Sequence, residues 1–257
     1  MSESARNAEL ERVREIHRRL KRAHGPLDPP PKREPLEELV LTILSQNTND
    51  LNRDRAWAAL RERFPSWDEL AAARERDVVD AIRPGGLANT KAPRILHVVR
   101  EIREREGGFD LSWMRDAPEP SVTEYLTSLP GVGRKTAACV LAFSLERPVI
   151  PVDTHVHRVA GRLGLLPPKT DAAKAHDVLA DRIPSRLRLP MHVALIRHGR
   201  VICKAGLPRC DICPLQDLCP AAPAYLREIE LRARTGTGRK ARRGEAHVSS
   251  SDRRREV

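Results

Sequence analysis

Apolar residues recur along most of the chain at the three- and four-residue spacing of buried helix faces. One stripe runs through Leu10, Val13 and Leu20, and a denser one runs through residues 36–44. No segment of the sequence shows a convincing alternation of apolar and polar residues, which is the pattern of a half-buried strand. The pattern therefore predicts an all-α protein.

Two proline-rich connectors interrupt the helical pattern, at residues 28–31 and 147–151. Such stiff segments are typical of boundaries between folded parts of a chain. From residue 232 onward the sequence is dominated by Gly, Ser, Thr, Arg and Lys, with almost nothing to bury. We expect this tail, residues 232–257, to be disordered and basic.

Composition narrows the class of partner. The 257 residues suffice for one large domain or two small ones. The sequence has no run of 18 apolar residues and its first residues are polar, so we expect no membrane partner and a cytoplasmic location. The net charge of +11 favours a polyanionic partner, nucleic acid before anionic lipid. Aromatic residues make up only 3%, which argues against binding single strands by rows of stacked bases.

Segment Leu129–Ala138 has the pattern of a tight turn between two helices. A capping box at Ser121–Glu124 predicts the start of the first helix. Gly131 and Gly133 permit a close approach of backbone to a ligand, and the N–H groups that open the second helix can hold a phosphate. Taken alone, the motif is better interpreted as an ordinary turn that carries a solvated Lys135, and the rest of the chain has to decide.

Four of the five cysteines follow the spacing C-x6-C-x2-C-x5-C, at Cys203, Cys210, Cys213 and Cys219. Four thiols within seventeen residues of a cytoplasmic protein predict a metal centre rather than disulfides. The spacing alone allows zinc or a [4Fe-4S] cluster, because both accept four thiolates. Cys139 lies apart, among small apolar helix residues, and is expected to be a core residue.

Together the hairpin Leu-Pro-Gly-Val-Gly-Arg-Lys-Thr-Ala, the segments Val152–His155 and Gly86–Asn89, and the cysteine spacing resemble endonuclease III. This family is the branch of the helix-hairpin-helix DNA glycosylase superfamily that has a C-terminal iron–sulfur loop. The resemblance covers roughly residues 10–225. It implies an all-α fold of two helical lobes with a DNA-binding cleft between them, and a [4Fe-4S] cluster on the four spaced cysteines.

The resemblance also implies how the chain is divided. The expected parts are an N-terminal helix of the iron–sulfur lobe (1–31), a six-helix barrel (32–150) with its hairpin at about 121–143, the iron–sulfur lobe (151–231) and the tail (232–257). These limits agree with the two proline-rich connectors.

By resemblance, Lys135 is the nucleophile and Asp153 is its catalytic partner. An amine at a helix N-terminus lies in positive potential, which favours its neutral, reactive form. It would attack C1′ of the deoxyribose, release the base and form a Schiff base, after which β-elimination cuts the strand. Asp153 would stabilise the cationic sugar and help deprotonate the lysine. The other interpretation of Asp153 is a plain N-cap of the next helix, and this role is compatible with catalysis.

The resemblance assigns DNA contacts to six residues: Gln46, Leu87, Gly131, Gly133, Arg134 and His155. The target nucleotide must leave the base stack. Gln46 would fill the vacated space and Leu87 would wedge between bases of the opposite strand. The other interpretations are that Gln46 only caps a helix, that Leu87 packs internally, and that His155 has a core or surface role.

These features predict a base excision repair glycosylase with apurinic/apyrimidinic (AP) lyase activity, a monomer that acts on damaged or abasic duplex DNA in the nucleoid. Oxidised or ring-saturated pyrimidines are the expected lesions, although the extra amides around Gln46 resemble other branches of the superfamily. A mismatch adenine glycosylase is disfavoured because only low-complexity sequence follows the cysteines. A DNA-binding paralogue without turnover is disfavoured by the presence of both Lys135 and Asp153.

Overall fold

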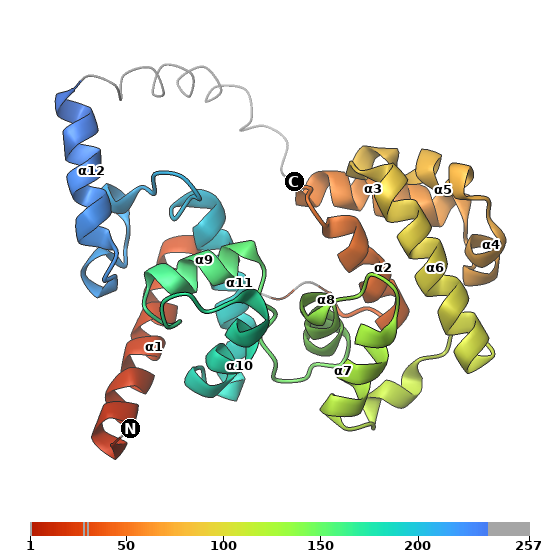
Figure 1. Ribbon diagram of the computed structural model, residues 1–257, viewed down its shortest axis with the longest axis horizontal. Helices are drawn as coiled ribbons and strands as arrows, with labels where there is room; N and C mark the ends of the chain where they lie inside the picture. Colours follow the sequence, from red (N-terminus) through yellow and green to blue (C-terminus); the bar gives the residue numbers. More distant parts are fainter. Residues whose placement is uncertain (1, 28, 30, 236–257) are drawn as a thin grey trace. The chain divides into compact units, whose positions relative to one another are not determined.

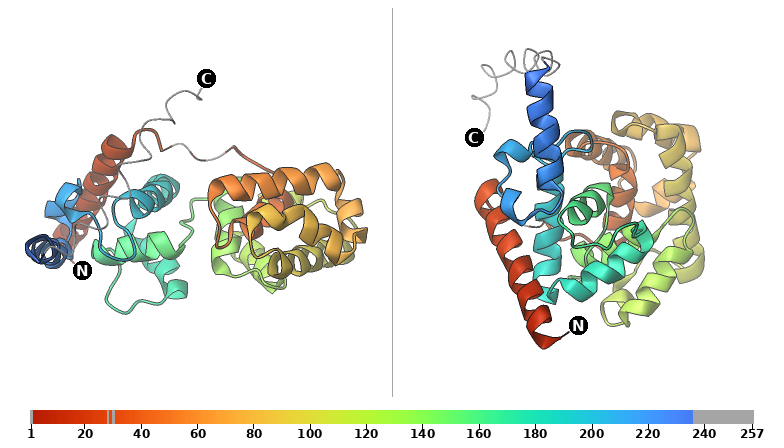
Figure 2. Two further views of the ribbon diagram at one scale, coloured as in Figure 1. Left: turned by 90° about the horizontal axis from the view of Figure 1, so that it is seen from above. Right: turned by 60° about the vertical axis from the view of Figure 1, so that its left-hand side comes forward.

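The computed structural model describes residues 2–27, 29 and 31–235, and every regular element within them is a helix (Figures 1 and 2). The α-helices are α1 (Glu3–His24), α2 (Pro35–Ser45), α3 (Asp50–Arg63), α4 (Trp67–Ala72), α5 (Glu75–Ile82), α6 (Ala88–Glu106), α7 (Glu119–Ser128), α8 (Arg134–Cys139), α9 (Thr154–Arg162), α10 (Ala172–Arg182), α11 (Ser185–Val201) and α12 (Ala222–Arg234). The short helices are η1 (Arg83–Gly85), η2 (Ser112–Arg115), the π-helix η3 (Val140–Ser144), η4 (Cys210–Ile212) and η5 (Gln216–Leu218). The prediction of an all-α fold is confirmed.

The chain divides into two compact units. The first unit consists of Met1–Pro26, Thr154–Thr170 and Ala194–Val257, and the second consists of Leu27–Asp153 and Asp171–Val193. The second unit therefore holds α2 to α8 and also α10, and the cysteine-rich loop belongs to the first. The lobe limits implied by the family resemblance stay a prediction.

Helix α2 forms the centre of the second unit. It packs against α3, α6 and α8, and nearly all of its residues are buried. Its apolar residues, with those of the surrounding helices, form the core of this unit. Burial all round explains the dense apolar run of residues 36–44, because no face of this helix meets water. Two polar residues, Glu38 and Thr42, are buried in the same helix.

The hairpin begins earlier than its sequence predicts. Helix α7 starts at Glu119 with Pro118 as its N-cap, so the capping box expected at Ser121 is wrong. Pro120 falls in the first turn of α7, where proline is favoured because its missing N–H would have no helical partner. Ser121 consequently lies inside the helix.

In the first unit, α1 buries Val13 and Leu20 of the stripe that its sequence predicts, together with Ile16, whereas Leu10 is half-buried. Helix α12 continues to Arg234, so the chain is still helical where the tail was expected to begin. The rest of that tail, residues 236–257, lies outside the described residues.

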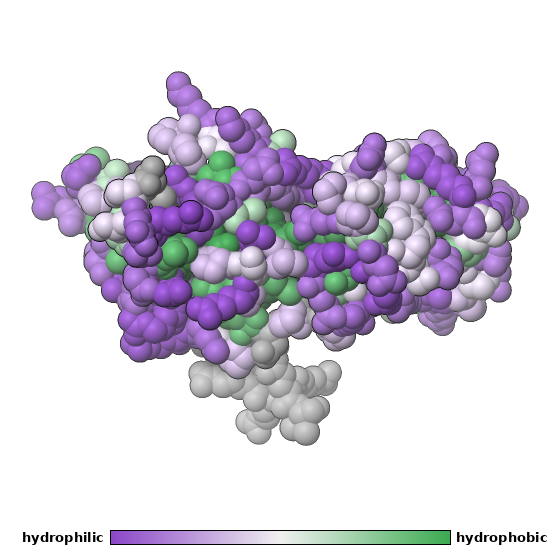
Figure 3. Space-filling model, turned by 90° about the horizontal axis from the view of Figure 1, so that it is seen from below, coloured by the Kyte–Doolittle hydropathy of each residue, from purple (hydrophilic) through white to green (hydrophobic). Residues whose placement is uncertain are grey.

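Hydrophilic residues cover most of the face drawn in Figure 3, with apolar residues in smaller areas between them. None of the described helices has both the length and the apolar composition needed to cross a bilayer.

Candidate active site and cysteine cavity

The turn of the hairpin is built on two glycines. Gly131 has φ +74°, a conformation that glycine adopts without steric cost. Gly133 is the N-cap of α8, and its carbonyl accepts from the N–H of Thr136 at 2.9 Å. The N–H groups of Gly131, Gly133 and Lys135 have no acceptor among the described residues. The turn therefore offers a set of free backbone donors to an anion.

Lys135 lies in the first turn of α8 and is half-buried. Its positive charge acts on buried groups from three different elements. It lowers the pKa of the Cys139 thiol, which burial raises, and that of the Glu38 carboxyl on α2, which burial also raises. It also adds to the effect of burial in lowering the pKa of His192 on α11.

Asp153 acts on two of these same groups. Its negative charge raises the pKa of His192 and also that of Cys139. Lys135 and Asp153 are eighteen residues apart in the sequence, yet they share two buried neighbours within the second unit. The fold thus brings the predicted nucleophile and the predicted carboxylate into one neighbourhood.

His192 is the member of this neighbourhood that the sequence did not single out. It is 3% exposed, and its Nδ1 donates to the carbonyl of Pro151 at 2.7 Å. Burial holds the pKa of His192 well below its ordinary value, so the ring is neutral at pH 7. This bond fixes the segment that leads into Asp153. The only sequence signal was a histidine inside an otherwise apolar helix face.

Gln46 and Asn47 lie at the end of α2. Gln46 is half-buried, and its Oε1 accepts from Nη1 of Arg94 at 2.9 Å. Asn47 is exposed and has φ +53°, a left-handed conformation that asparagine tolerates better than most residues. The role of Gln46 at the DNA stays a prediction.

Leu87 is presented to solvent by a glycine-rich turn. Gly85 packs so closely on α3 that a Cβ atom there would lie 2.9 Å from Cβ of Ala56. Gly86 and Leu87 both have positive φ, at +68° and +52°. The Leu87 side chain is 54% exposed, so the interpretation that it packs internally is wrong. Its contact with DNA stays a prediction.

Arg134 and His155 each contact a neighbouring helix. The guanidinium of Arg134 donates to both carboxylate oxygens of Asp177 and, at 2.9 Å, to the carbonyl of Ala173 on α10. In the first unit, His155 Nδ1 accepts from Nη2 of Arg158 at 3.1 Å. The DNA contacts expected of both residues stay predictions.

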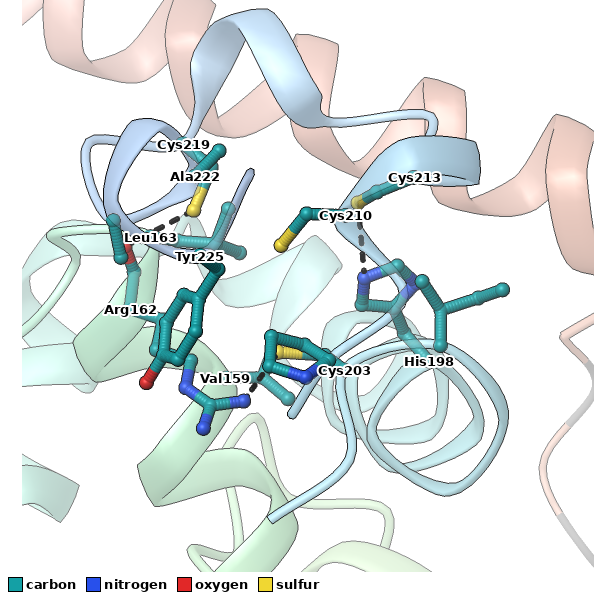
Figure 4. A pocket seen from close by; sticks show the side chains of 13 residues that line it. Val159, Arg162, Leu163, His198, Cys203, Cys210, Cys213, Cys219, Ala222 and Tyr225 are labelled. Atoms are coloured by element: carbon teal, nitrogen blue, oxygen red, sulfur yellow. Dashed lines mark hydrogen bonds between the residues drawn. The ribbon is translucent and has the colours of Figure 1, made fainter. Parts of the chain in front are cut away.

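The four spaced cysteines line one cavity of the first unit (Figure 4). Cys203 follows α11, Cys210 opens η4, Cys213 follows η4, and Cys219 follows η5. Within residues 2–27, 29 and 31–235, no three His, Cys, Asp or Glu side chains converge as the ligands of one metal ion. The four sulfur atoms instead surround a shared space.

Polar groups hold three of these sulfurs. Arg162 Nη1 donates to Cys203 Sγ at 3.3 Å, and His198 Nε2 lies 3.6 Å from Cys213 Sγ (Figure 4). Cys219 Sγ donates to the carbonyl of Arg162 at 3.2 Å. Burial raises the pKa of Cys213 to about 11, so thiolate formation in this cavity needs a compensating cation.

Comparison with known proteins identifies the class of protein that this fold and site define. Residues 40–185, more than half of the chain, match the HhH-GPD superfamily of base excision DNA repair proteins. The chain belongs to this superfamily.

Endonuclease III of Thermotoga maritima is 36% identical over 209 residues, which cover 81% of this chain and 91% of that protein. A putative DNA glycosylase of Arabidopsis thaliana is 36% identical over 194 residues, 74% of this chain, and the chain spans 66% of its length. A solved structure of a trapped endonuclease III–DNA covalent intermediate matches with a TM-score of 0.73 and 28% identity, covering 84% of this chain and 98% of that one. The chain is therefore an endonuclease III-like DNA glycosylase and AP lyase of base excision repair, and DNA is its partner.

Proposed function

We propose that this enzyme removes oxidised or ring-saturated pyrimidines from duplex DNA and then cuts the strand through a Schiff base on Lys135. One observation carries the proposal: Lys135, in the first turn of the second helix of the hairpin, shares the buried neighbours Cys139 and His192 with Asp153. An amine, a carboxylate and free backbone donors in one neighbourhood are the groups this reaction needs.

In the proposed reaction the neutral amine of Lys135 attacks C1′ of the deoxyribose, and the bond to the base breaks as the base leaves with a proton. The C1′–O4′ bond of the sugar then opens, O4′ takes up a proton, and an imine forms between Lys135 and C1′. The imine acidifies C2′, whose proton is lost as the bond to the 3′ phosphate oxygen breaks. The carboxylate of Asp153 stabilises the positive charge that develops on the sugar. The hydrogen bond from His192 to Pro151 holds the backbone before Asp153 in place.

We further propose that Cys203, Cys210, Cys213 and Cys219 hold a [4Fe-4S] cluster. The donor set consists of four thiols around a shared space, which suits a cluster with one iron at each sulfur. Such a cluster would cross-link the loop that carries Lys204 and Arg209, two bases suited to a phosphate backbone. It takes no part in base release. We expect a monomer that resides on DNA in the nucleoid.

Borohydride trapping on duplexes with defined lesions tests the lysine assignment. Wild-type protein should form a covalent complex with a thymine glycol duplex and with an abasic duplex, and Lys135→Gln should form none. Lys174→Gln, an exposed lysine on α10, is the matched control and should trap normally. Normal trapping by Lys135→Gln would refute the assignment.

Base release and strand cleavage should be scored separately on duplexes with ring-saturated pyrimidine, oxidised pyrimidine, 8-oxoguanine or mismatched adenine. We expect both products from the first two duplexes. Tight binding without either product on any lesion would favour a DNA-binding paralogue, and release of mismatched adenine alone would favour the adenine glycosylase.

A further inference from the structure

Arg94 on α6 lies between the two segments of the second unit that are expected to meet DNA. Its Nη1 donates to Oε1 of Gln46 at 2.9 Å. The same side chain crosses the hairpin turn: a Cβ atom on Gly131 would lie 2.6 Å from Cδ of Arg94 and 2.8 Å from its Nε. The stem of Arg94 therefore packs directly on Gly131, whose positive φ is the feature that favours glycine.

The guanidinium of Arg94 has donors to spare. It carries five N–H groups, and the bond to Gln46 is the one hydrogen bond it makes to the described residues. No described carboxylate pairs with it. Two other arginines of α6 differ: Arg100 donates to the carbonyls of Ala71 and Ala73, and Arg105 donates to a glutamate and a serine.

The Arg94 guanidinium is half-buried, so part of it stays open to a ligand that offers oxygen acceptors. Beside Arg94 the N–H of Gly131 also lacks an acceptor among the described residues. A planar guanidinium next to a free backbone N–H suits an oxyanion that accepts several hydrogen bonds, and phosphate is such a group.

We propose that Arg94 binds a backbone phosphate of the DNA at the hairpin turn and holds Gln46 in register with that phosphate. The proposal rests on the proposed function for the identity of the polyanion. Arg94 is thus a phosphate-binding residue and also the positioning residue of Gln46. The phosphate contact is independent of base sequence, whereas the contact with Gln46 matters only after the helix has been opened.

Salt-dependent binding tests the phosphate contact. The probes are a duplex with a tetrahydrofuran abasic analogue, which resists cleavage, and an undamaged duplex of the same sequence. Arg94→Met keeps the stem that packs on Gly131 and removes the charge. It should weaken binding to both duplexes about tenfold at 0.1 M salt and reduce the slope of log K against log salt by about 0.9, the value for one phosphate.

Two variants serve as controls for this measurement. Arg100→Gln, on the same helix, should leave the slope unchanged because its donors are used by carbonyl groups. Arg94→Lys should keep the wild-type slope. A wild-type slope in folded Arg94→Met would overturn the proposal. An equal change of slope in Arg100→Gln would also overturn it. So would binding of inorganic phosphate at millimolar concentration that leaves the slope of DNA binding unchanged.

A double-mutant cycle tests the link to Gln46. Base release by Arg94→Lys, Gln46→Ala and the double variant should be non-additive, with the double variant no slower than the slower single one. Additive effects would refute the positioning role. Thermal unfolding checks the fold of each variant. Because the cycle uses Arg94→Lys, it can be measured even if Arg94→Met does not fold.

The binding arm also separates the two proposals. If no lesion duplex is processed while the slope still depends on Arg94, the proposed reaction fails and the phosphate site stands. If trapping through Lys135 succeeds and the slope does not depend on Arg94, the phosphate site alone fails.

Discussion

The neighbourhood of Lys135 and the cysteine cavity are assembled in opposite ways. In the cavity the four cysteines come from one seventeen-residue segment, and Arg162 and His198 hold their sulfurs. Around Lys135 the groups come from α2, α8, the segment before α9, and α11, and several are buried neutral. The ligands of a metal centre can be close in sequence because one short loop can fold around the centre. The groups around a reactive lysine lie on separate elements, and here only the packing of the helices brings them together.

The largest difference should appear when one cysteine of each region is changed. Cys213→Ser should lose the cluster, with loss of iron and of absorption near 400 nm, and the first unit should unfold at a lower temperature. Cys139→Ser should keep its iron and cost about 1–3 kcal/mol, because it replaces a buried thiol by a hydroxyl, which loses more solvation on burial. Iron analysis and thermal unfolding measure both effects. Retention of iron by Cys213→Ser would contradict the ligand assignment.

His192 should link stability to pH in the Lys135 neighbourhood. Its pKa is lowered in the folded protein, so it contributes stability that is present above pH 6.5 and is lost as the pH falls through the folded value. His192→Phe should cost about 1–3 kcal/mol at pH 7 by leaving the carbonyl of Pro151 unpaired. The variant should also lose less stability than wild type between pH 6.5 and pH 5. Denaturant unfolding across that range measures the effect, and parallel curves would argue against it.

Leu87 should separate function from stability. Because its side chain is 54% exposed, Leu87→Ala should change the free energy of unfolding by less than about 0.5 kcal/mol. Base release should nevertheless fall about tenfold, an effect of about 1.4 kcal/mol, if the side chain wedges into the opened duplex. Leu231 on α12 is 61% exposed, and Leu231→Ala is the control that should leave both quantities unchanged. Single-turnover base release decides the matter, and a wild-type rate for Leu87→Ala would remove the wedge.

Substitution of Glu38 should have the smallest effect on the free energy of unfolding, and it should stabilise the protein rather than destabilise it. Glu38 is 5% exposed, and its Oε2 has no hydrogen-bond partner among the residues that the structure describes. Burial raises the pKa of Glu38 despite the hydrogen bond from Thr42 and the charges of Arg33, Lys135 and Arg53. An acid whose pKa is raised stabilises the fold below its unfolded value, 4.5, and loses that contribution as the pH rises through the folded value. Glu38→Gln should therefore be more stable than wild type at pH 8, by about 1 kcal/mol. The gain should vanish near pH 4.5. Thermal unfolding at the two pH values measures it, and a gain independent of pH would contradict the assignment.

Local signals in the sequence carried much of the fold and of the site. Helical spacing, the glycines of the hairpin and the cysteine spacing are patterns within a few turns of chain, and the structure bears out the helices that they predict. The start of α7 was predicted wrongly because a serine three residues before a glutamate can occur inside a helix as well as at its N-terminus. Pro118 and Pro120 decide the boundary instead.

The sequence by itself determined the all-α class, the position of Lys135 at the start of a helix after a glycine turn, and the set of four cysteines. The tertiary structure decided which groups meet: His192 with Pro151, Arg94 with Gln46 and Gly131, and Arg134 with Asp177. Each of these contacts joins residues more than thirty positions apart. No periodicity or spacing encodes such pairs, because they form only when helices that are amphipathic for other reasons bury their apolar faces together.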